Sequence, residues 1–545
     1  MSQSERVPLW VRWVVWLIAP LALGLLAVEL GFAFSWDARN YHYYNGFALL
    51  EGRMGHDIAP AARQTFHNPV LDVPFYLVYQ HLARPWPGFL LGSLHGLNIP
   101  LLFLLAWTVI RHPTATTARA LTALAVVVAG VLHTSFLVEV GGAAQDNVVS
   151  LFVLAALVIL ARSLRAGNLA DRAALARILA AGCLLGAATG LKPTAAIFCV
   201  GAVLAVGMLP GSSWGTRGRW LVALALGGVI GAAATGGFWA VRMARLTGNP
   251  LFPYLNQLFR SDLVAPKSFE YRGFLTTDTI FWGDPDVINE ELWALRTLCI
   301  DDFRYLTVFV LLLAALAVRF VRGRLDWSTV VDHRAGVLLA WFFIGSFTAW
   351  LKIFAIHRYM LALGLIVPIL IVFLFESVVP FRRVRALTFA LIGVVLIAGV
   401  TLETPKRVPW DPDPFRVDLA GSDIGDDALV VMIDWAPTSY VIPEFPAGAR
   451  FVRPVGNLYL RPHDRLYEII TSTIRNHRGP LYTLHARESR TEEQRQRRLD
   501  QLGLVQRRDS CIPLRNQRII DRLVLCPATR RPDARSAPTG RPRTG

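Results

Sequence analysis

Long apolar stretches alternate with short polar connections along most of this chain. A helix needs about 20 apolar residues to cross the hydrocarbon core of a bilayer. We therefore predict a polytopic α-helical membrane protein with eleven transmembrane helices, at Leu9–Phe34, Pro87–Ile110, Arg119–Val138, Asn147–Ala161, Ala174–Leu191, Pro193–Leu209, Arg219–Val241, Tyr305–Phe320, Ala335–Phe354, Tyr359–Val379 and Arg385–Thr401.

The fifth and sixth predicted helices are separated by a break. A single helix over Ile178–Leu209 would be longer than about 40 Å, whereas the bilayer core is only about 30 Å thick. The sequence Gly190-Leu-Lys-Pro193 provides the break, because proline removes a helical hydrogen bond and biases the preceding residue away from helix.

The arginines predict the orientation of these helices. Arginine and lysine concentrate in the cytoplasmic connections of membrane proteins. With a cytoplasmic N-terminus, the connections on that side contain most of the arginines between spans: Arg111, Arg162, Arg165, Arg172, Arg177, Arg217, Arg219, Arg319, Arg322, Arg324, Arg334, Arg382, Arg383 and Arg385. Four regions then share the outer face: the loops 35–86, 139–146 and 242–304, and the tail from residue 402.

The tail has the pattern of a folded domain. Apparent strands lie at 429–435, 481–485 and 523–526, and Thr-Glu-Glu-Gln from Thr491 is a capping box that starts a helix. We therefore divide the chain into a transmembrane domain (1–402), a small extracytoplasmic α/β domain (403–527) and a disordered basic tail (528–545).

Composition agrees with a membrane protein: 54% of the residues are hydrophobic and only 17% are charged, against about 25% charged in soluble domains. The net charge of +16 does not indicate nucleic-acid binding, because the basic residues fall mainly between apolar stretches. Cys511 and Cys526 in the tail either pair as a disulfide in an oxidising compartment or remain two buried thiols.

The connection after the first predicted helix carries the first candidate chemistry. Trp36–Asn45 holds Asp37 and four aromatic rings at the membrane edge, where ionisable groups are costly and tend to mark function. Asp37 is the candidate catalytic acid of this loop, and the candidate substrate-binding residues are Arg39, His42, Asp57 and Asn68. Most of the rings also fit an aromatic belt, and Asp57 also fits a cap or turn residue. The spacing of rings in Tyr41–Leu50 is compatible with a short amphipathic helix lying in the interface.

Asp146 is the acid that we select in the second outer loop. It opens a predicted helix, so it is either an N-cap or a second site residue. Together with Asp37 it could bind a divalent cation, or the two acids could divide the roles of base and positioning group.

The chain contains only four lysines, and all four fall on the outer side in this topology. Lys192 lies in a tight turn, and Lys352 precedes the basic segment His357-Arg358 at another outer turn. These side chains either reach phospholipid headgroups or bind a phosphate that belongs to a substrate.

Several of these segments resemble the GT-C superfamily of integral-membrane glycosyltransferases, which use polyprenyl-phosphate-linked sugars. The resemblance rests on Trp36-Asp37, on Gln145-Asp146-Asn147 and on an outer soluble tail. Three further segments are similar to bacterial members: Gly190-Leu-Lys-Pro-Thr194, Gly248-Asn-Pro-Leu-Phe-Pro253 and His357-Arg-Tyr359. The resemblance covers the chain to about Thr401.

This resemblance implies an enzyme of a bacterial inner membrane that transfers a sugar, with inversion, to a hydroxyl of a glycan, lipid or protein. It implies that Asp37 is the base, that Asp146 is the second acid and that Lys192 and Arg358 contact the donor phosphate. Many members carry two adjacent acids in the first loop, whereas Ala38 follows Asp37 here, which puts the need for a metal in doubt.

Two alternative functions remain from the sequence. A transporter or flippase would place polar residues near the bilayer midplane and repeat its halves, and we find no such repeat. An O-antigen ligase or polymerase would place its key groups in a late outer loop, whereas Asp37 follows the first predicted span.

Overall fold

The computed structural model forms two compact units. The membrane unit comprises Met1–Ala33, Trp86–Phe238 and Glu270–Pro405, and the loop–tail unit comprises Phe34–Pro85, Trp239–Phe269 and Lys406–Gly545. The structure describes residues 6–111, 116–164, 171–266, 302–322, 330–353, 356–378, 393, 407–410, 413–419, 422–487, 491–514 and 523–531.

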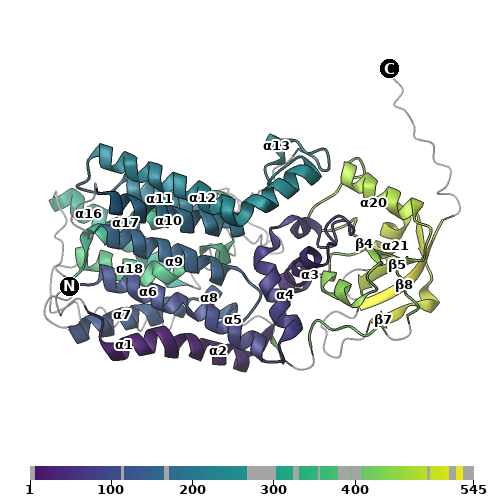
Figure 1. The fold of residues 1–545 in the computed structure, drawn as a ribbon, viewed down its shortest axis with the longest axis horizontal. Coiled ribbons are helices and arrows are strands. Elements are labelled where there is room, and N and C mark those ends of the chain that lie inside the picture. Colours follow the sequence, from purple (N-terminus) through teal and green to yellow (C-terminus); the bar gives the residue numbers. More distant parts are fainter. Residues whose placement is uncertain are drawn as a thin grey trace, which may run out of the picture. The chain divides into compact units, whose positions relative to one another are not determined.

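In the residues that the structure describes, the membrane unit is helical apart from the short strand β1 (Phe32–Ala33). Its packed helices include the pairs α9–α10 and α11–α17, which lie side by side (Figure 1). Its helical elements are α1 (Leu9–Trp13), η2 (Val14–Ile18), α2 (Ala19–Leu30), α5 (Trp86–Gly96), α6 (Asn98–Val109), α7 (Thr116–Val131), α8 (Thr134–Val138), α9 (Asp146–Ser163), α10 (Arg172–Leu191), η6 (Pro193–Ala195), α11 (Ala196–Gly207), α12 (Trp214–Thr247, which continues into the other unit), α16 (Phe303–Arg322), α17 (His333–Ile353), η9 (His357–Met360) and α18 (Leu361–Val378).

Eight helices in the described part of the chain are long and apolar enough to cross a membrane: Leu9–Leu30, Trp86–Val109, Asp146–Ser163, Arg172–Leu191, Trp214–Thr247, Phe303–Arg322, His333–Ile353 and His357–Val378. Two shorter apolar helices, Thr116–Val131 and Pro193–Gly207, correspond to two further predicted spans. The predicted span 385–401 lies outside the described residues, apart from Gly393. Large apolar side chains point outward from these helices, and Phe320 is 90% exposed. The chain is therefore a membrane-embedded helical protein.

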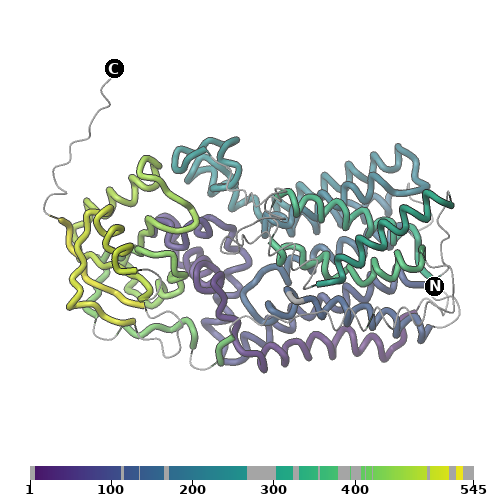
Figure 2. Tube along the Cα trace, turned by 180° about the vertical axis from the view of Figure 1, so that it is seen from behind, coloured from purple at the N-terminus to yellow at the C-terminus, as the bar shows by residue number. Residues whose placement is uncertain are grey.

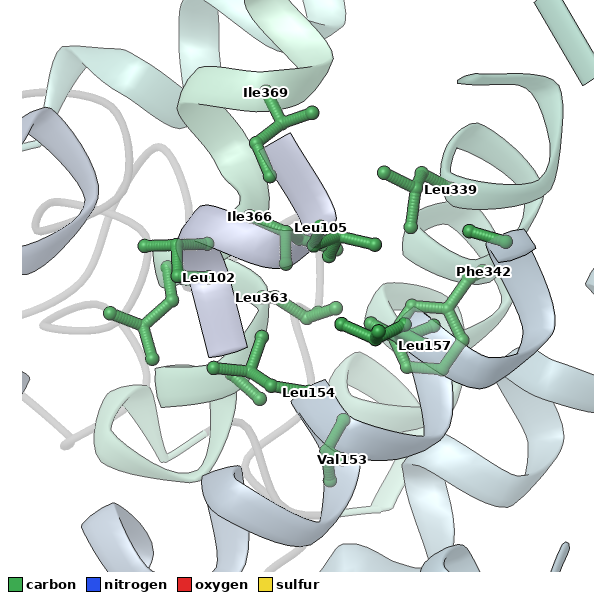
Figure 3. Packing of buried hydrophobic residues seen from close by; sticks show 14 of the residues in the cluster. Leu102, Leu105, Val153, Leu154, Leu157, Leu339, Phe342, Leu363, Ile366 and Ile369 are labelled. Atoms are coloured by element: carbon green, nitrogen blue, oxygen red, sulfur yellow. The ribbon is translucent and has the colours of Figure 1, made fainter. Parts of the chain in front are cut away.

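The centre of the membrane unit is a continuous apolar core. Figure 3 shows part of this core, where leucine, isoleucine and phenylalanine side chains interdigitate. The labelled side chains come from α6 (Leu102, Leu105), α9 (Val153, Leu154, Leu157), α17 (Leu339, Phe342) and α18 (Leu363, Ile366, Ile369). All ten are fully or almost fully buried, so this packing fixes the ends of the same helices, where polar residues gather.

Small residues bring α10 and α12 into close contact. Gly182, Gly186 and Gly190 recur every four residues on one face of α10. A Cβ atom at Gly186 would clash with the carbonyl oxygen of Gly228. Small residues at this spacing let helix backbones approach closely in membranes.

The predicted break between α10 and α11 is confirmed. α10 ends at Leu191, Lys192 has extended backbone angles (φ −142°, ψ 107°), and Pro193 begins η6. The turn therefore holds Lys192 at a helix end, as the proline predicted.

The loop–tail unit contains a small mixed sheet with the strand order β4-β3-β5-β8-β6, and β7 also pairs with β8. β3 pairs in parallel with β4 and with β5, whereas β8 is antiparallel to β5, β6 and β7. All its strands come from the tail, drawn yellow-green to yellow in Figure 2. They are β3 (Leu429–Met432), β4 (Arg450–Val452), β5 (Leu481–Ala486), β6 (Leu504–Gln506), β7 (Ile512–Leu514) and β8 (Leu523–Arg530).

The other described elements of this unit are helical, apart from the short strand β2 (Arg407–Val408). The amphipathic helix α20 buries Leu466, Ile470 and Ile474, which are four residues apart, in the core of the unit. The helical elements are η3 (Ala38–His42), α3 (Tyr43–Leu50), η4 (Ala62–Phe66), η5 (Pro69–Leu71), α4 (Asp72–His81), α13 (Asn256–Phe259), η10 (Ser439–Glu444), α20 (Arg465–Asn476), α21 (Glu492–Gln501) and η11 (Arg508–Ser510).

Several expectations for the tail can be compared with this unit. Strands occur at the three predicted places, and the Thr491 side chain caps α21 by accepting a hydrogen bond from the N–H of Gln494. The expected start of disorder at residue 528 is wrong, because pairing with β6 extends β8 to Arg530. Residues 532–545 lie outside the described part. Cys511 and Cys526 form a disulfide, so these cysteines are paired and are not two buried thiols.

The first outer loop folds together with the tail, which the sequence did not predict. Ile58 pairs with β4: its N–H donates to the carbonyl oxygen of Phe451 at 2.8 Å, and its carbonyl accepts from the N–H of Arg453 at 3.1 Å. The expected interfacial helix at 41–50 forms as η3 and α3, but Tyr43 and Tyr44 are buried. α3 packs on α4 and η10, so the interpretation as a helix lying in the interface is wrong.

Candidate functional site

Polar side chains gather at one end of the helix bundle in the membrane unit. The N-terminal ends of α9, α16 and α18 and the C-terminal ends of α7, α10 and α17 meet there, as the contacts below show. The opposite ends of the same helices carry arginines, among them Arg162 at the end of α9, Arg322 at the end of α16 and Arg334 at the start of α17. We call the first end the polar end of the membrane unit.

Two predicted site residues, Asp146 and Lys192, form an ion pair at this end. The Lys192 ammonium lies 2.7 Å from Oδ1 of Asp146, and the two side chains are 13% and 7% exposed. Asp146 is the first residue of α9, but the N-cap is Gln145, so the N-cap interpretation of Asp146 is wrong. Oδ2 of Asp146 is buried and has no hydrogen-bond partner among the residues that the structure describes.

Tyr359 lies close to two of the predicted cations. The Lys192 ammonium is 5.0 Å from the centre of the Tyr359 ring, and the Arg358 guanidinium carbon is 5.4 Å from the same centre. Cations at this distance are attracted by the ring quadrupole. The 3-10 turn η9 presents Arg358 and Tyr359 next to the break after α10, so two segments far apart in sequence build one cationic site.

The other predicted cation, Lys352, is placed differently. It occupies the last turn of α17 and is exposed. No ion pair of Lys352 occurs within the described ranges.

His357 belongs to a second, more buried cluster with His133 and Asp302. One ring nitrogen of each histidine and one carboxylate oxygen of Asp302 lie within 4.8 Å of one another. The two imidazole rings stack with their centres 5.2 Å apart, and Nε2 of His133 lies 3.8 Å from Oδ2 of Asp302. This arrangement of nitrogen and oxygen atoms is one that could hold a metal ion.

Four of the residues at this end were missed by the sequence interpretation: His133, Asp302, Arg304 and Tyr305. A signal existed for His133, because a histidine within a predicted apolar span is itself unusual. Asp302 lies directly before α16, near the end of the predicted outer loop 242–304, and no sequence motif marks it. Nothing in the sequence alone indicated that these two residues meet.

The remaining predicted residues lie in the loop–tail unit. Asp37 precedes η3, is half-buried and does not cap that helix through its side chain. The Arg39 guanidinium donates to the carbonyl oxygen of Ser35 at 3.4 Å and lies 5.2 Å from the centre of the Phe34 ring. His42 is buried, with Nδ1 at 2.6 Å from a carboxylate oxygen of Asp72.

Asp57 has a structural role that accounts for its burial. It accepts hydrogen bonds from Arg53 at 2.7 and 2.9 Å, from the Tyr44 hydroxyl at 2.9 Å and from the N–H of Phe451 at 2.9 Å. Burial, and then the Asp57 carboxylate, raise the pKa of the Tyr44 phenol well above its usual range, so Tyr44 remains a donor. Asp57 thereby fastens the first outer loop to β4.

Asn68 also makes a local contact. Its side-chain oxygen accepts a hydrogen bond from the N–H of Val70 at 3.2 Å and caps η5. The residues predicted as a metal pair, Asp37 and Asp146, belong to different units.

The fold defines a membrane-embedded helical protein with an additional small α/β unit, and its membrane unit carries a buried polar end. A comparison of the chain with protein-family models found no match, and a search of curated proteins found none either.

Proposed function

We propose that this protein is a glycosyltransferase that transfers a sugar from a polyprenyl-phosphate donor to an acceptor hydroxyl, with inversion, at the outer face of a bacterial inner membrane. The observation that carries this proposal is the position of Lys192 and Arg358 on the same Tyr359 ring. Two cations held together at the end of apolar helices form a site for an anion that belongs to a lipid.

Negative charge develops on the leaving phosphate during this reaction, and we propose that the phosphate lies beside these cations. In a direct displacement, an acceptor oxygen forms a bond to the anomeric carbon while the bond from that carbon to the phosphate oxygen breaks. The leaving polyprenyl phosphate takes the electron pair of the broken bond, so positive groups beside it lower the barrier. Lys192 and Arg358 fit this role, and His357 and Lys352 are further proposed contacts of the donor phosphate.

The Asp146–Lys192 pair fits the same proposal. The carboxylate of Asp146 holds the Lys192 ammonium in one position and balances its positive charge until a substrate binds. A phosphate that approaches Lys192 then competes with Asp146 for the same ammonium, and the second carboxylate oxygen of Asp146 is available to position a substrate hydroxyl.

We assign the acceptor side of the reaction to Asp37. A carboxylate can accept the proton of the attacking hydroxyl, which contributes typically 10²- to 10⁴-fold to a rate. We propose that Arg39 and His42 line the acceptor site.

The proposed orientation has its own support and its own test. The Cys511–Cys526 disulfide fits an oxidising compartment, and the arginine-rich ends of the helices fit the cytoplasmic side. A reporter that is active only outside the cytoplasm, fused after Pro412, should therefore be active. If a reporter that is active only in the cytoplasm is active at the same fusion point, the tail lies on the cytoplasmic side and the proposed orientation is wrong.

A transfer assay tests the enzyme itself. Purified protein in lipid nanodiscs should transfer labelled sugar from a polyprenyl-phosphate donor, and Lys192→Met and Arg358→Gln should each lower the rate about 10²- to 10³-fold. Asp37→Asn should abolish turnover, whereas Arg219→Gln, an exposed arginine at the start of α12, should retain it. Full activity of Asp37→Asn would exclude the proposed base. Substrate movement across the bilayer without transfer would favour the transporter alternative.

A further inference from the structure

We propose that His133, Asp302 and His357 bind a divalent transition-metal ion, with Zn²⁺ as the ion that their ligand atoms fit best. This site is distinct from the Asp37 and Asp146 pair that the sequence suggested for a cation. The proposal does not depend on the glycosyltransferase assignment, because it rests on the ligand atoms alone.

The three residues come from three separate segments that the helix core holds in place. His133 follows α7, Asp302 precedes α16 and His357 begins η9. His133 is fully buried and Asp302 is 2% exposed. The ligand atoms lie within 4.8 Å of one another, so small side-chain movements would bring them to metal-bonding distance of about 2.0–2.2 Å.

A second observation at this cluster points to a missing partner. Nδ1 of His133 is buried and has no hydrogen-bond partner within the described part of the chain. A buried polar atom without a partner costs about 1–3 kcal/mol. A cation bound at Nδ1 of His133 would supply that partner and offset part of this cost, while Nε2 keeps its contact with the Tyr305 hydroxyl.

The chemistry of the ligand atoms selects the kind of metal. Two imidazoles and one carboxylate match the ligands that Zn²⁺ takes at sites with three protein ligands and one open position. Mg²⁺ and Ca²⁺ prefer oxygen ligands, so they fit two histidines poorly. We therefore expect a borderline transition metal and one exchangeable position.

Hydroxyl groups surround the two histidines in the manner of outer-shell partners. The Ser135 hydroxyl lies 2.9 Å from Nδ1 of His357, and the Tyr305 hydroxyl lies 3.1 Å from Nε2 of His133. Such partners fix the ring orientation and the tautomer of metal-binding histidines. Arg304 orients Asp302 through paired hydrogen bonds, one of them 2.7 Å long. An ionised carboxylate has about four lone-pair positions, so the guanidinium leaves room for a metal.

The charge balance predicts what occupies the open position. Asp302 and Arg304 neutralise each other, so a divalent ion would bring its whole charge into a buried site. An anion as the fourth ligand would reduce this cost. We therefore expect inorganic phosphate to strengthen metal binding.

Metal analysis of the full chain tests the site without any sugar donor. Protein purified without a histidine tag, stripped with a chelator and reloaded with Zn²⁺ should retain one ion per chain after desalting. Reloading with Co²⁺ should give the visible absorption of a tetrahedral site. His133→Gln and Asp302→Asn should lose the ion at a concentration that saturates the wild type, whereas His333→Gln, an exposed histidine at the start of α17, should keep it.

A milder variant protects the test against misfolding. Ser135→Ala removes only a hydroxyl and should weaken Zn²⁺ binding about 10- to 100-fold while the protein elutes as wild type in size exclusion. A wild-type protein that retains no Zn²⁺ and gives no Co²⁺ absorption would overturn the proposal. Equal affinity of the wild type and the His133→Gln variant would do the same. Loss of transfer activity alone bears only on the proposed function, since metal binding is measured without a donor.

Discussion

The Lys192 ammonium and the Asp146 carboxylate lie 2.7 Å apart at the polar end of the membrane unit, although 46 residues separate them in the chain. The sequence assigned them different roles, one as a phosphate contact and one as an acid. Their contact makes them one charged unit in which each holds the other in place. A change to either residue should therefore affect both.

A double-mutant cycle measures this relationship. Asp146→Asn leaves the Lys192 ammonium without its partner, and Lys192→Met leaves the carboxylate alone, so each should destabilise the protein by about 3 kcal/mol. The loss of unfolding free energy in the double variant should be about 1–3 kcal/mol smaller than the sum of the losses in the two single variants. Unfolding in detergent mixtures would measure these free energies. Strict additivity would show that the pair does not form in the membrane.

Arg453 should be among the most sensitive residues of the loop–tail unit. Its buried guanidinium donates to the side chain of Asn40 at 3.0 Å and to the carbonyl oxygens of Pro60 at 2.9 Å, Asp434 at 3.1 Å and Ala436. Burial lowers its pKa to about 10, so the group is still charged at neutral pH. Lysine lacks the planar fork that reaches these acceptors.

We expect Arg453→Lys to destabilise the protein by about 3 kcal/mol, because carbonyl groups are left without donors. Thermal unfolding of the purified full chain would measure this. The control is Arg465→Lys, since Arg465 is 59% exposed and its pair with Glu468 is at the surface. That change should stay within about 0.5 kcal/mol of wild type. Equal effects of the two substitutions would contradict the buried role of Arg453.

His485 on β5 should make stability depend on pH. Burial, and then the neighbouring Arg495, lower the pKa of His485 to about 4. The unfolded chain, with an ordinary value near 6.5, therefore binds a proton more readily than the folded chain. The contribution of this residue to stability is complete above about pH 6.5 and is lost as the pH falls towards 4, by about 3 kcal/mol.

His485→Gln should flatten this part of the pH profile. Unfolding free energies of the wild type and the variant, measured between pH 4 and 7, should converge as the pH falls. The same slope in both proteins would show that other groups cause the acid sensitivity.

The Cys511–Cys526 disulfide should stabilise the loop–tail unit. It closes a loop across a sequence separation of 15 residues, and such a crosslink contributes about 3 kcal/mol in the chain-entropy account. Cys511→Ser or reduction should lower the unfolding temperature. Cys183→Ser is the control, because Cys183 is a free cysteine in α10.

Labelling with a thiol reagent would test the bond directly. In unfolded wild-type protein, reduction should increase the number of labelled cysteines by two. In a Cys511→Ser/Cys526→Ser variant, reduction should not change the number of labelled cysteines. Equal labelling before and after reduction would show that the two thiols are not joined.

The helical part of the fold was the most accessible to prediction. Apolar stretches of about 20 residues correspond to the eight long apolar helices found in the described part of the chain, and Pro193 predicted the break after Leu191. Strand positions in the tail also followed from short apolar segments, and Thr491 predicted the start of α21. These features are local, because a few neighbouring residues determine them.

The first outer loop shows where prediction from local pattern fails. The aromatic spacing of Tyr43 and Tyr44 is the same for a helix in a lipid interface and for a helix packed against other helical elements of the protein. Only the pairing of Ile58 with β4 and the contacts of Asp57 place this loop inside the loop–tail unit. Likewise, a cysteine pair becomes a disulfide only when the strands bring Cys526 beside Cys511.

The sequence by itself determined that this is a helical membrane protein, and it marked Asp146, Lys192 and Arg358 as unusual charges at helix ends. Tertiary structure decided which side chains meet. It pairs Lys192 with Asp146 and brings Lys192 and Arg358 to the same Tyr359 ring. It also brings His133, Asp302 and His357 together. The physical reason is that hydrophobicity and helix breaks act over a few turns of the chain. A binding site instead requires side chains from distant segments, and only the packing of the helices fixes their distances.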